Sequence, residues 1–206
     1  MPDKRLRTGV LISGSGTNLQ ALIDACASKD FPAEIVLVIS NRADAGGLGR
    51  AERAGIPALI IPHKEYSSRE AFDAALDAAL IKAGVEFICL AGFMRLLSEG
   101  FVHKWRDRLI NIHPSLLPAF KGIDAVEQAL AAGVSRTGCT VHFVRPEMDA
   151  GPILLQAEVP VEPGDTPDIL HGRIRAAEHR CYPEALRLAA SGKVSIRNEV
   201  VFLDET

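Results

Sequence analysis

The residues with the clearest chemical potential lie at the end of one apolar segment. Residues 109–113 read Leu-Ile-Asn-Ile-His, and Pro114 follows them. Successive side chains of a β-strand point to opposite faces, so Asn111 and His113 would share one face. Pro114 cannot donate to a strand ladder, so the strand should end at His113. Open α/β sheets bind ligands at the carboxyl ends of their strands, where both side chains would lie.

An amide and an imidazolium at such a position suit acyl transfer. Asn111 and a protonated His113 can both donate a hydrogen bond to an oxygen that gains negative charge. A carboxylate beside the ring would favour the charged imidazolium, and Asp149, in a loop flanked by proline and glycine, is the candidate. A strand-end histidine and a turn-forming aspartate are also ordinary structural features, so the pattern alone leaves both interpretations open.

Other catalytic classes have weaker support in this sequence. Ser13 and Ser115 lack the G-x-S-x-G context of a nucleophile. The four cysteines are scattered, without a C-x-x-C pair, and the other histidines lack a metal-ligand spacing such as H-E-x-x-H. We therefore expect no metal and no covalent nucleophile, which leaves direct transfer between two bound substrates.

A glycine-rich turn follows the first expected strand. Residues 13–18 read Ser-Gly-Ser-Gly-Thr-Asn before a helical pattern. Backbone N–H groups at a helix start favour a phosphate, and Thr17 and Asn18 add side-chain donors. Leu19 replaces the third glycine of the dinucleotide fingerprint, and no P-loop lysine follows. The turn is compatible with phosphate binding or with a plain strand-to-helix connection.

The periodicity predicts one α/β domain over residues 1–206, with a Rossmann-like, open, mostly parallel sheet and helices on both faces. The expected strands are 8–12, 34–39, 58–61, 85–90, 109–113, 138–144 and 153–157, with a closing hairpin at 194–196 and 200–203. The expected helices follow residue 18, span 47–54, and begin after Ser68, Gly122 and Thr166, the last one bent or ended by Pro183.

Two further segments bear on ligands. The second strand ends in Ser40-Asn41 instead of an acidic residue, which argues against a nicotinamide cofactor. Residues 91–97, after the fourth strand, are unusually apolar for a loop, since loops usually lie in water. This segment either walls a pocket for a flat ligand or packs under a neighbouring helix.

Composition limits the class of protein. The chain has 206 residues, 48% of them hydrophobic and 24% charged, as in globular domains. Its net charge of -3 argues against nucleic acid as a main partner. No apolar run approaches membrane-spanning length and the start lacks a signal pattern, so we expect a cytoplasmic protein. The scattered cysteines fit a reducing compartment, and we expect a monomer or a homodimer.

Several motifs occur together in a known family. Residues 111–118, Asn-Ile-His-Pro-Ser-Leu-Leu-Pro, and 148–152, Met-Asp-Ala-Gly-Pro, resemble the folate-dependent formyltransferase family. Residues 13–20, 91–95 and 178–183 also resemble the family, so the similarity extends over nearly the whole chain. The resemblance implies 10-formyltetrahydrofolate as the formyl donor, and glycinamide ribonucleotide, an intermediate of purine synthesis, as the acceptor.

The resemblance also implies roles for individual residues. Those implied to be catalytic are Asn111, His113 and Asp149. Those implied to hold the ribonucleotide are Gly16, Thr17, Asn18, Arg175, Ala176, Ala177 and Glu178. Those implied to line the folate site are Arg69, Met94, Arg95, Leu96, Leu97, Asn111, Arg145, Pro146, Glu147, Met148 and Asp149. Residues 119–122, Ala-Phe-Lys-Gly, depart from some relatives and leave the role of Lys121 open.

Three other functions compete with formyl transfer to this acceptor. A deformylase would use the same groups with water, but such relatives usually carry an N-terminal regulatory domain, and the first strand is expected within ten residues of Met1. Formylation of methionyl-tRNA would need an additional C-terminal domain and a basic RNA-binding face. A catalytically silent nucleotide-binding module would keep the turn without turnover.

Overall fold

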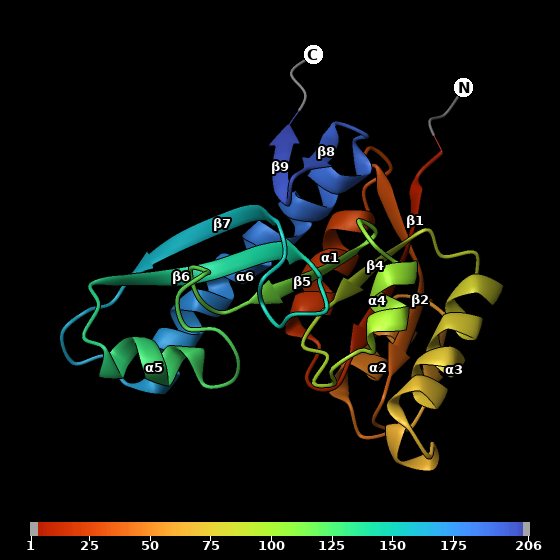
Figure 1. Cartoon of the computed structure of the whole chain (residues 1–206), viewed down its shortest axis with the longest axis horizontal. Helices are drawn as coiled ribbons and strands as arrows, with labels where there is room; N and C mark the ends of the chain where they lie inside the picture. Colours follow the sequence, from red (N-terminus) through yellow and green to blue (C-terminus); the bar gives the residue numbers. More distant parts are fainter. Residues whose placement is uncertain (1–3, 204–206) are drawn as a thin grey trace.

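The protein, described here by a computed structural model over residues 4–203, is built around a seven-stranded sheet in the order β3-β2-β1-β4-β5-β6-β7 (Figure 1). The strands from β3 to β5 pair in parallel, while β6 is antiparallel to both β5 and β7. This confirms the expected open, mostly parallel, Rossmann-like sheet. The strands are β1 (Leu6–Ile12), β2 (Ala33–Ser40), β3 (Ala58–Ile60), β4 (Phe87–Leu90), β5 (Leu109–His113), β6 (Arg136–Phe143) and β7 (Ile153–Pro160).

Helices cover both faces of the sheet, and a separate hairpin follows the last helix. The helices are α1 (Thr17–Cys26), α2 (Gly46–Arg53), α3 (Arg69–Lys82), α4 (Glu99–Lys104), α5 (Ala125–Ala131) and α6 (Pro167–Ala190), with a 3₁₀ turn η1 (His63–Glu65). The hairpin consists of β8 (Val194–Arg197) and β9 (Val200–Leu203), which form a sheet of their own (Figure 1).

Alternation along the buried strands divides the core into two layers. Val10 and Ile12 of β1 pack in one cluster with Leu19 of α1 and Tyr182 of α6. The side chain between them, Leu11, packs on the other face, in the cluster that α3 and α4 complete. Successive side chains of a strand leave opposite faces, so one strand of apolar residues serves both layers.

The order of the strands places a topological switch point at β1, inside the sheet. β1 pairs with β2 on one side and β4 on the other, so the direction of chain progression reverses there. Ligands of open α/β sheets bind outside the carboxyl ends of strands near such a point. β1, β4 and β5 end at this edge with Ile12, Leu90 and His113.

The structure differs from the sequence-based expectations at several elements. Helix α4 was not expected, although Ser98 caps it and Phe101 and Val102 anchor it in the core. The first strand begins two residues earlier than expected and β4 begins at Phe87. Of the two outcomes expected at Pro183, an end of the helix is excluded, because buried residues on both sides of the proline keep the two halves of α6 packed on the sheet.

Two further features concern composition. All four cysteines are unpaired and buried, as expected of small core residues. Among residues 4–203, no helix combines the length and apolar character needed to cross a membrane. The charged start of the chain partly lies outside the described residues. The boundaries of a single domain at residues 1 and 206 stay a prediction.

Candidate active site

The end of β5 carries the two polar residues with which the sequence analysis began. Leu109, Ile110 and Ile112 are buried in the core, and Asn111 is half-buried at a cavity wall. His113 is the last residue of the strand and only 5% exposed. Pro114 follows and β5 stops, so both polar side chains lie at the carboxyl edge of the sheet.

Protein acceptors face both ring nitrogens of His113. Nε2 lies 2.8 Å from the carbonyl oxygen of Phe120, and Nδ1 lies 3.5 Å from Oδ2 of Asp149. Phe120 and Asp149 both have left-handed backbone, with φ of 55° and 52°. In an imidazolium, each ring nitrogen would carry a proton that faces one of these two acceptors.

Asp149 is held from several sides although it lies in a loop. Its side chain is 8% exposed, and its Oδ2 accepts a hydrogen bond of 2.8 Å from the backbone N–H of Gly122. Burial by itself would raise the pKa of Asp149, but His142, the Gly122 N–H and the charge of His113 together lower that pKa below its usual range. The carboxylate is therefore ionised at neutral pH.

His142 is a site residue that sequence reasoning missed. It lies on β6 directly opposite Asn111 of β5, and its Nε2 is 3.4 Å from the Asn111 amide nitrogen and 3.6 Å from Oδ1 of Asp149. Its Nδ1 lies 3.1 Å from the Phe143 carbonyl, to which it can donate. The neutral ring can then accept from Asn111, and the protonated ring can donate to Asp149. Only the antiparallel register of β5 and β6 reveals this contact.

The apolar loop of residues 91–97 walls a cavity that opens onto these groups. The cavity has a volume of about 340 Å³, and Asn111, His142 and Asp149 lie in its wall among apolar side chains such as Leu90, Phe93 and Val144. Such a lining suits a flat ring held by a few polar groups. Of the predicted folate contacts, the cavity is lined by Met94, Arg95, Leu96, Leu97, Asn111, Arg145, Pro146, Met148 and Asp149.

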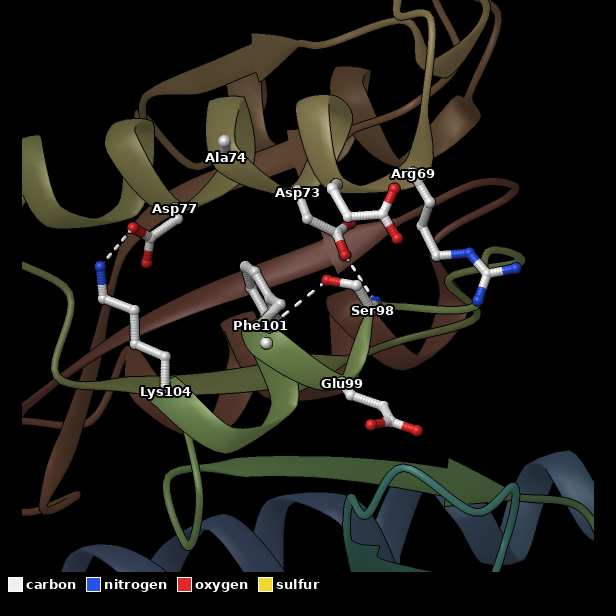
Figure 2. Close-up of a pocket in the computed structure, with 10 residues that line it drawn as sticks. Arg69, Asp73, Ala74, Asp77, Ser98, Glu99, Phe101 and Lys104 are labelled. Carbon is white, nitrogen blue, oxygen red and sulfur yellow. Dashed lines mark hydrogen bonds and ion pairs between the residues drawn. The ribbon is translucent and has the colours of Figure 1, made fainter.

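Two predicted folate contacts lie outside this cavity. Glu147 lines a second cavity on the other side of the Asp149 loop, together with Lys121. Arg69, the first residue of α3, lines a groove between α3 and α4 (Figure 2). The structure therefore brings neither side chain into the apolar cavity, and a contact of either with a ligand there stays a prediction.

The groove between α3 and α4 has mostly internal pairing. Figure 2 shows Arg69 at the opposite end of this groove from Lys104. The backbone N–H of Ser98 donates to Asp73, and Lys104 forms an ion pair of 2.5 Å with Asp77. Trp105 also donates its indole N–H to Asp77. These contacts pin α4 against α3, which gives the acidic residues a structural explanation.

The glycine-rich turn meets α6 at a second part of the site. Gly16 has a φ of 72°, and a Cβ there would lie 2.5 Å from the Cα of Gly47, so the turn requires glycine. The Asn18 amide donates to Oε2 of Glu178 at 2.9 Å, which joins α1 to α6. Burial raises the pKa of Glu178, although the hydrogen bond from Asn18 opposes the shift.

The charges around this turn favour an anion. The Arg50 guanidinium donates to the Ser15 carbonyl, and Arg175 is exposed on the same side of α6 as His179. Burial, together with the charges of Arg175 and Arg50, lowers the pKa of His179. Of the other predicted ribonucleotide contacts, Ala176 is exposed, whereas the methyl group of Ala177 packs in the core.

Comparison with known proteins identifies the family. A family model described as formyl transferase matches residues 6–186. The chain belongs to the formyl transferase family. The matched residues span every strand of the main sheet, from β1 to β7, and both parts of the site. The family resemblance expected from the sequence is thereby confirmed.

Individual formyl transferases resemble the chain closely. The phosphoribosylglycinamide formyltransferase of Escherichia coli strain K12 is 44% identical over 195 residues, which cover 95% of this chain and 92% of that protein. The crystal structure of glycinamide ribonucleotide transformylase 1 from Symbiobacterium toebii is 53% identical, with a TM-score of 0.95, covering 98% of this chain and 95% of that one.

A longer relative contains a similar segment. The trifunctional purine biosynthetic protein adenosine-3 of Bos taurus is 55% identical over 193 residues, which are 94% of this chain but 19% of that protein. The chain thus spans about a fifth of the length of this relative.

Proposed function

We propose that this formyl transferase moves the formyl group of 10-formyltetrahydrofolate to the primary amine of glycinamide ribonucleotide, a step of purine synthesis. The observation that carries the proposal is that Asp149 lies within 3.6 Å of both His113 and His142, and that His142 lies against Asn111 in the wall of an apolar cavity. The names of the similar bacterial enzyme and of the similar solved structure support this choice of acceptor.

The two substrates would occupy the two parts of the site. The flat ring system of the folate fits the apolar cavity beside residues 91–97. The phosphate of the acceptor fits the N–H groups of residues 16–18 at the start of α1, and the carboxylate of Glu178 can accept from sugar hydroxyls. Binding them side by side supplies proximity without a covalent intermediate.

The reaction would begin with attack of the acceptor amine on the formyl carbon. Asn111 and protonated His113 then donate hydrogen bonds to the oxygen as it becomes negative, and loss of one such donor typically costs about 2.7–4 kcal/mol of transition-state stabilisation. The C–N bond to folate N10 breaks, and the proton that the attacking amine loses ends on N10, directly or through water.

We infer that the proton on Nδ1 of His113 would serve the substrate. Nε2 is engaged by the Phe120 carbonyl at 2.8 Å, whereas Nδ1 is 3.5 Å from Asp149, longer than an ordinary hydrogen bond. The Nδ1 proton is therefore the one that a formyl oxygen entering from the cavity could accept. Asp149 keeps the ring charged and oriented during this exchange.

An absorbance assay of folate deformylation tests the proposal. The protein is mixed with 10-formyltetrahydrofolate, with and without glycinamide ribonucleotide. We expect signal only with the acceptor, and a fall in kcat of about 10²-fold or more in Asp149→Asn, with smaller changes in either KM. Signal without the acceptor would indicate a hydrolase instead, no signal a binding module, and full turnover in Asp149→Asn would remove Asp149 from the mechanism.

A further inference from the structure

A tight turn joins the two strands of the hairpin that follows α6, and this turn lies near the loop that carries Asp149. Arg197 of β8 pairs with Val200 of β9, so Asn198 and Glu199 form a two-residue turn, with left-handed φ values of 51° and 60°. Two left-handed residues are typical of the turn that matches the twist of a hairpin. The turn fixes the direction in which the hairpin presents Glu199.

The guanidinium of Arg145 forms ion pairs with Glu199 and Asp107. The Nε of Arg145 donates to Oε2 of Glu199 at 2.5 Å, and one terminal nitrogen donates to Oδ1 of Asp107 at 2.7 Å. The other terminal nitrogen donates to the carbonyl of Val144 at 3.1 Å. The Arg145 side chain is only 8% exposed, whereas its partners Asp107 and Glu199 are 46% and 49% exposed. Arg145 is thus engaged with the protein, although the family resemblance suggested a contact with folate.

Arg145 lies at the start of the loop that carries Asp149. This loop connects β6 to β7, and Asp149 holds a left-handed backbone within it. Gly151 closes the loop against Phe143, where no side chain fits. A backbone conformation that is costly for aspartate persists only when its surroundings hold it. The Gly122 N–H holds the carboxylate itself, and Arg145, fixed by Glu199, donates to the carbonyl of Val144 at the start of the loop.

We infer that Glu199 is a positioning residue for formyl transfer, acting through Arg145 to hold the loop in which Asp149 meets His113. Glu199 is itself held by a second ion pair, with Arg106, and touches neither His113 nor Asp149. The inference rests on the proposed role of Asp149. A displacement of about 1 Å in a reacting group can lower a rate about 10²-fold, so a strap of this kind can influence turnover from outside the site.

The test compares Glu199→Gln, which keeps the shape and removes the charge, with the control Glu184→Gln. Glu184 forms a comparable ion pair with Arg187, within α6 and away from the loop. We expect Glu199→Gln to lower kcat about 10- to 100-fold, while KM for glycinamide ribonucleotide stays within about twofold, because its expected contacts lie at residues 16–18 and Glu178. Glu184→Gln should keep the wild-type kcat.

Amide hydrogen exchange over residues 145–151 separates positioning from a general loss of folding. We expect faster exchange in this loop in Glu199→Gln, with β1 and β4 unchanged, and wild-type exchange in Glu184→Gln. Arg145→Lys, which keeps the charge but loses the fork of donors, should show the same two changes to a smaller extent. If Glu199→Gln keeps the wild-type kcat and exchange while Asp149→Asn is inactive, the role of Glu199 is overturned and the proposed mechanism stands. An active Asp149→Asn would overturn the proposed mechanism.

Discussion

Nδ1 of His113 lies 3.5 Å from Oδ2 of Asp149, and the other carboxylate oxygen of Asp149 lies 3.6 Å from Nε2 of His142. One carboxylate thus stands between two imidazoles that come from neighbouring strands, β5 and β6. Its two oxygens are not equivalent, because Oδ2 also accepts from the Gly122 N–H. The arrangement links the charge of His113 to the orientation of the Asn111 amide through His142.

The lowered pKa of Asp149 predicts how its contribution to stability depends on pH. Because the carboxyl has a lower pKa in the folded than in the unfolded chain, where it is about 3.9, the ionised group stabilises the fold fully above about pH 5 and loses this effect as pH falls through the folded pKa. The free energy of unfolding of wild type minus that of Asp149→Asn should therefore shrink between pH 5 and pH 3. Urea titrations of both proteins at each pH measure this difference in free energy. A difference that does not change with pH would contradict the lowered pKa of Asp149.

Removal of the His142 ring should impair turnover. His142→Gln leaves the Asn111 amide and Asp149 without the imidazole, and we expect kcat to fall about 10- to 100-fold through loss of orientation. The control is His171→Gln, since His171 is partly exposed and lies 3.7 Å from Glu127 on the surface. Steady-state kinetics with both substrates saturating measure the effect. Equal kcat values for the two variants would exclude His142 from the site.

Glu178→Gln should stabilise the protein and weaken the binding of the acceptor substrate, glycinamide ribonucleotide. Burial raises the pKa of Glu178, so the charged form costs folding free energy above that pKa, and a neutral glutamine can still accept from Asn18. Each kcal/mol of relieved cost should raise Tm by about 2–4 °C at this chain length. We expect a higher Tm in calorimetry at pH 7 and a higher KM for glycinamide ribonucleotide. A lower Tm would show that the charge is compensated.

Ser13→Ala should affect the folate cavity through the apolar loop. The Ser13 hydroxyl donates to Oδ1 of Asn41 at 2.6 Å and accepts from the N–H of Met94 at 2.8 Å, so it ties the end of β1 to the loop. Loss of the hydroxyl leaves Oδ1 of Asn41 and the N–H of Met94 without this partner, which costs about 1–3 kcal/mol of stability for each group. We expect KM for 10-formyltetrahydrofolate to rise several-fold, more than KM for the acceptor.

A matched control for Ser13→Ala is Thr166→Ala. Thr166 caps α6 by accepting from the N–H of Ile169, and loss of such a cap costs about 0.5–2 kcal/mol. This variant should lower stability in denaturant titrations without changing KM for the folate. The same rise in KM in both variants would trace the effect of Ser13→Ala to stability alone.

Gly151→Ala should disturb the Asp149 loop, whereas Gly172→Ala should not. A Cβ at Gly151 would lie 1.7 Å from the Phe143 carbonyl oxygen, so the loop must move, and we expect a loss of about 1–3 kcal/mol together with a fall in kcat. A Cβ at Gly172, within α6, meets no atom within 4 Å, and alanine there should stabilise the helix by about 0.5–1 kcal/mol. Thermal unfolding and kcat are measured for both. Wild-type behaviour of Gly151→Ala would contradict the packing.

Local properties of the chain were sufficient to predict the sheet and one side of the site. Alternation along residues 109–113 put Asn111 and His113 on one face, because a strand has a period of two, and Pro114 marked its end. Glycine at position 16 predicted the turn before α1. Weak or short patterns were missed, as with α4, which has only six residues and buries Phe101 and Val102 in a core cluster that α3 and the sheet complete.

The partners of these residues depended on tertiary structure. His142 faces Asn111 only because of the register between β5 and β6, and the Phe120 carbonyl reaches His113 only because a left-handed residue turns the chain. Glu199 meets Arg145 across more than fifty positions of sequence. Side-chain periodicity follows from the geometry of each backbone segment, whereas contacts between distant segments follow from how the whole sheet and its loops pack. The amino-acid sequence therefore determined which groups were available at the strand end, and the folded chain decided which of them touch.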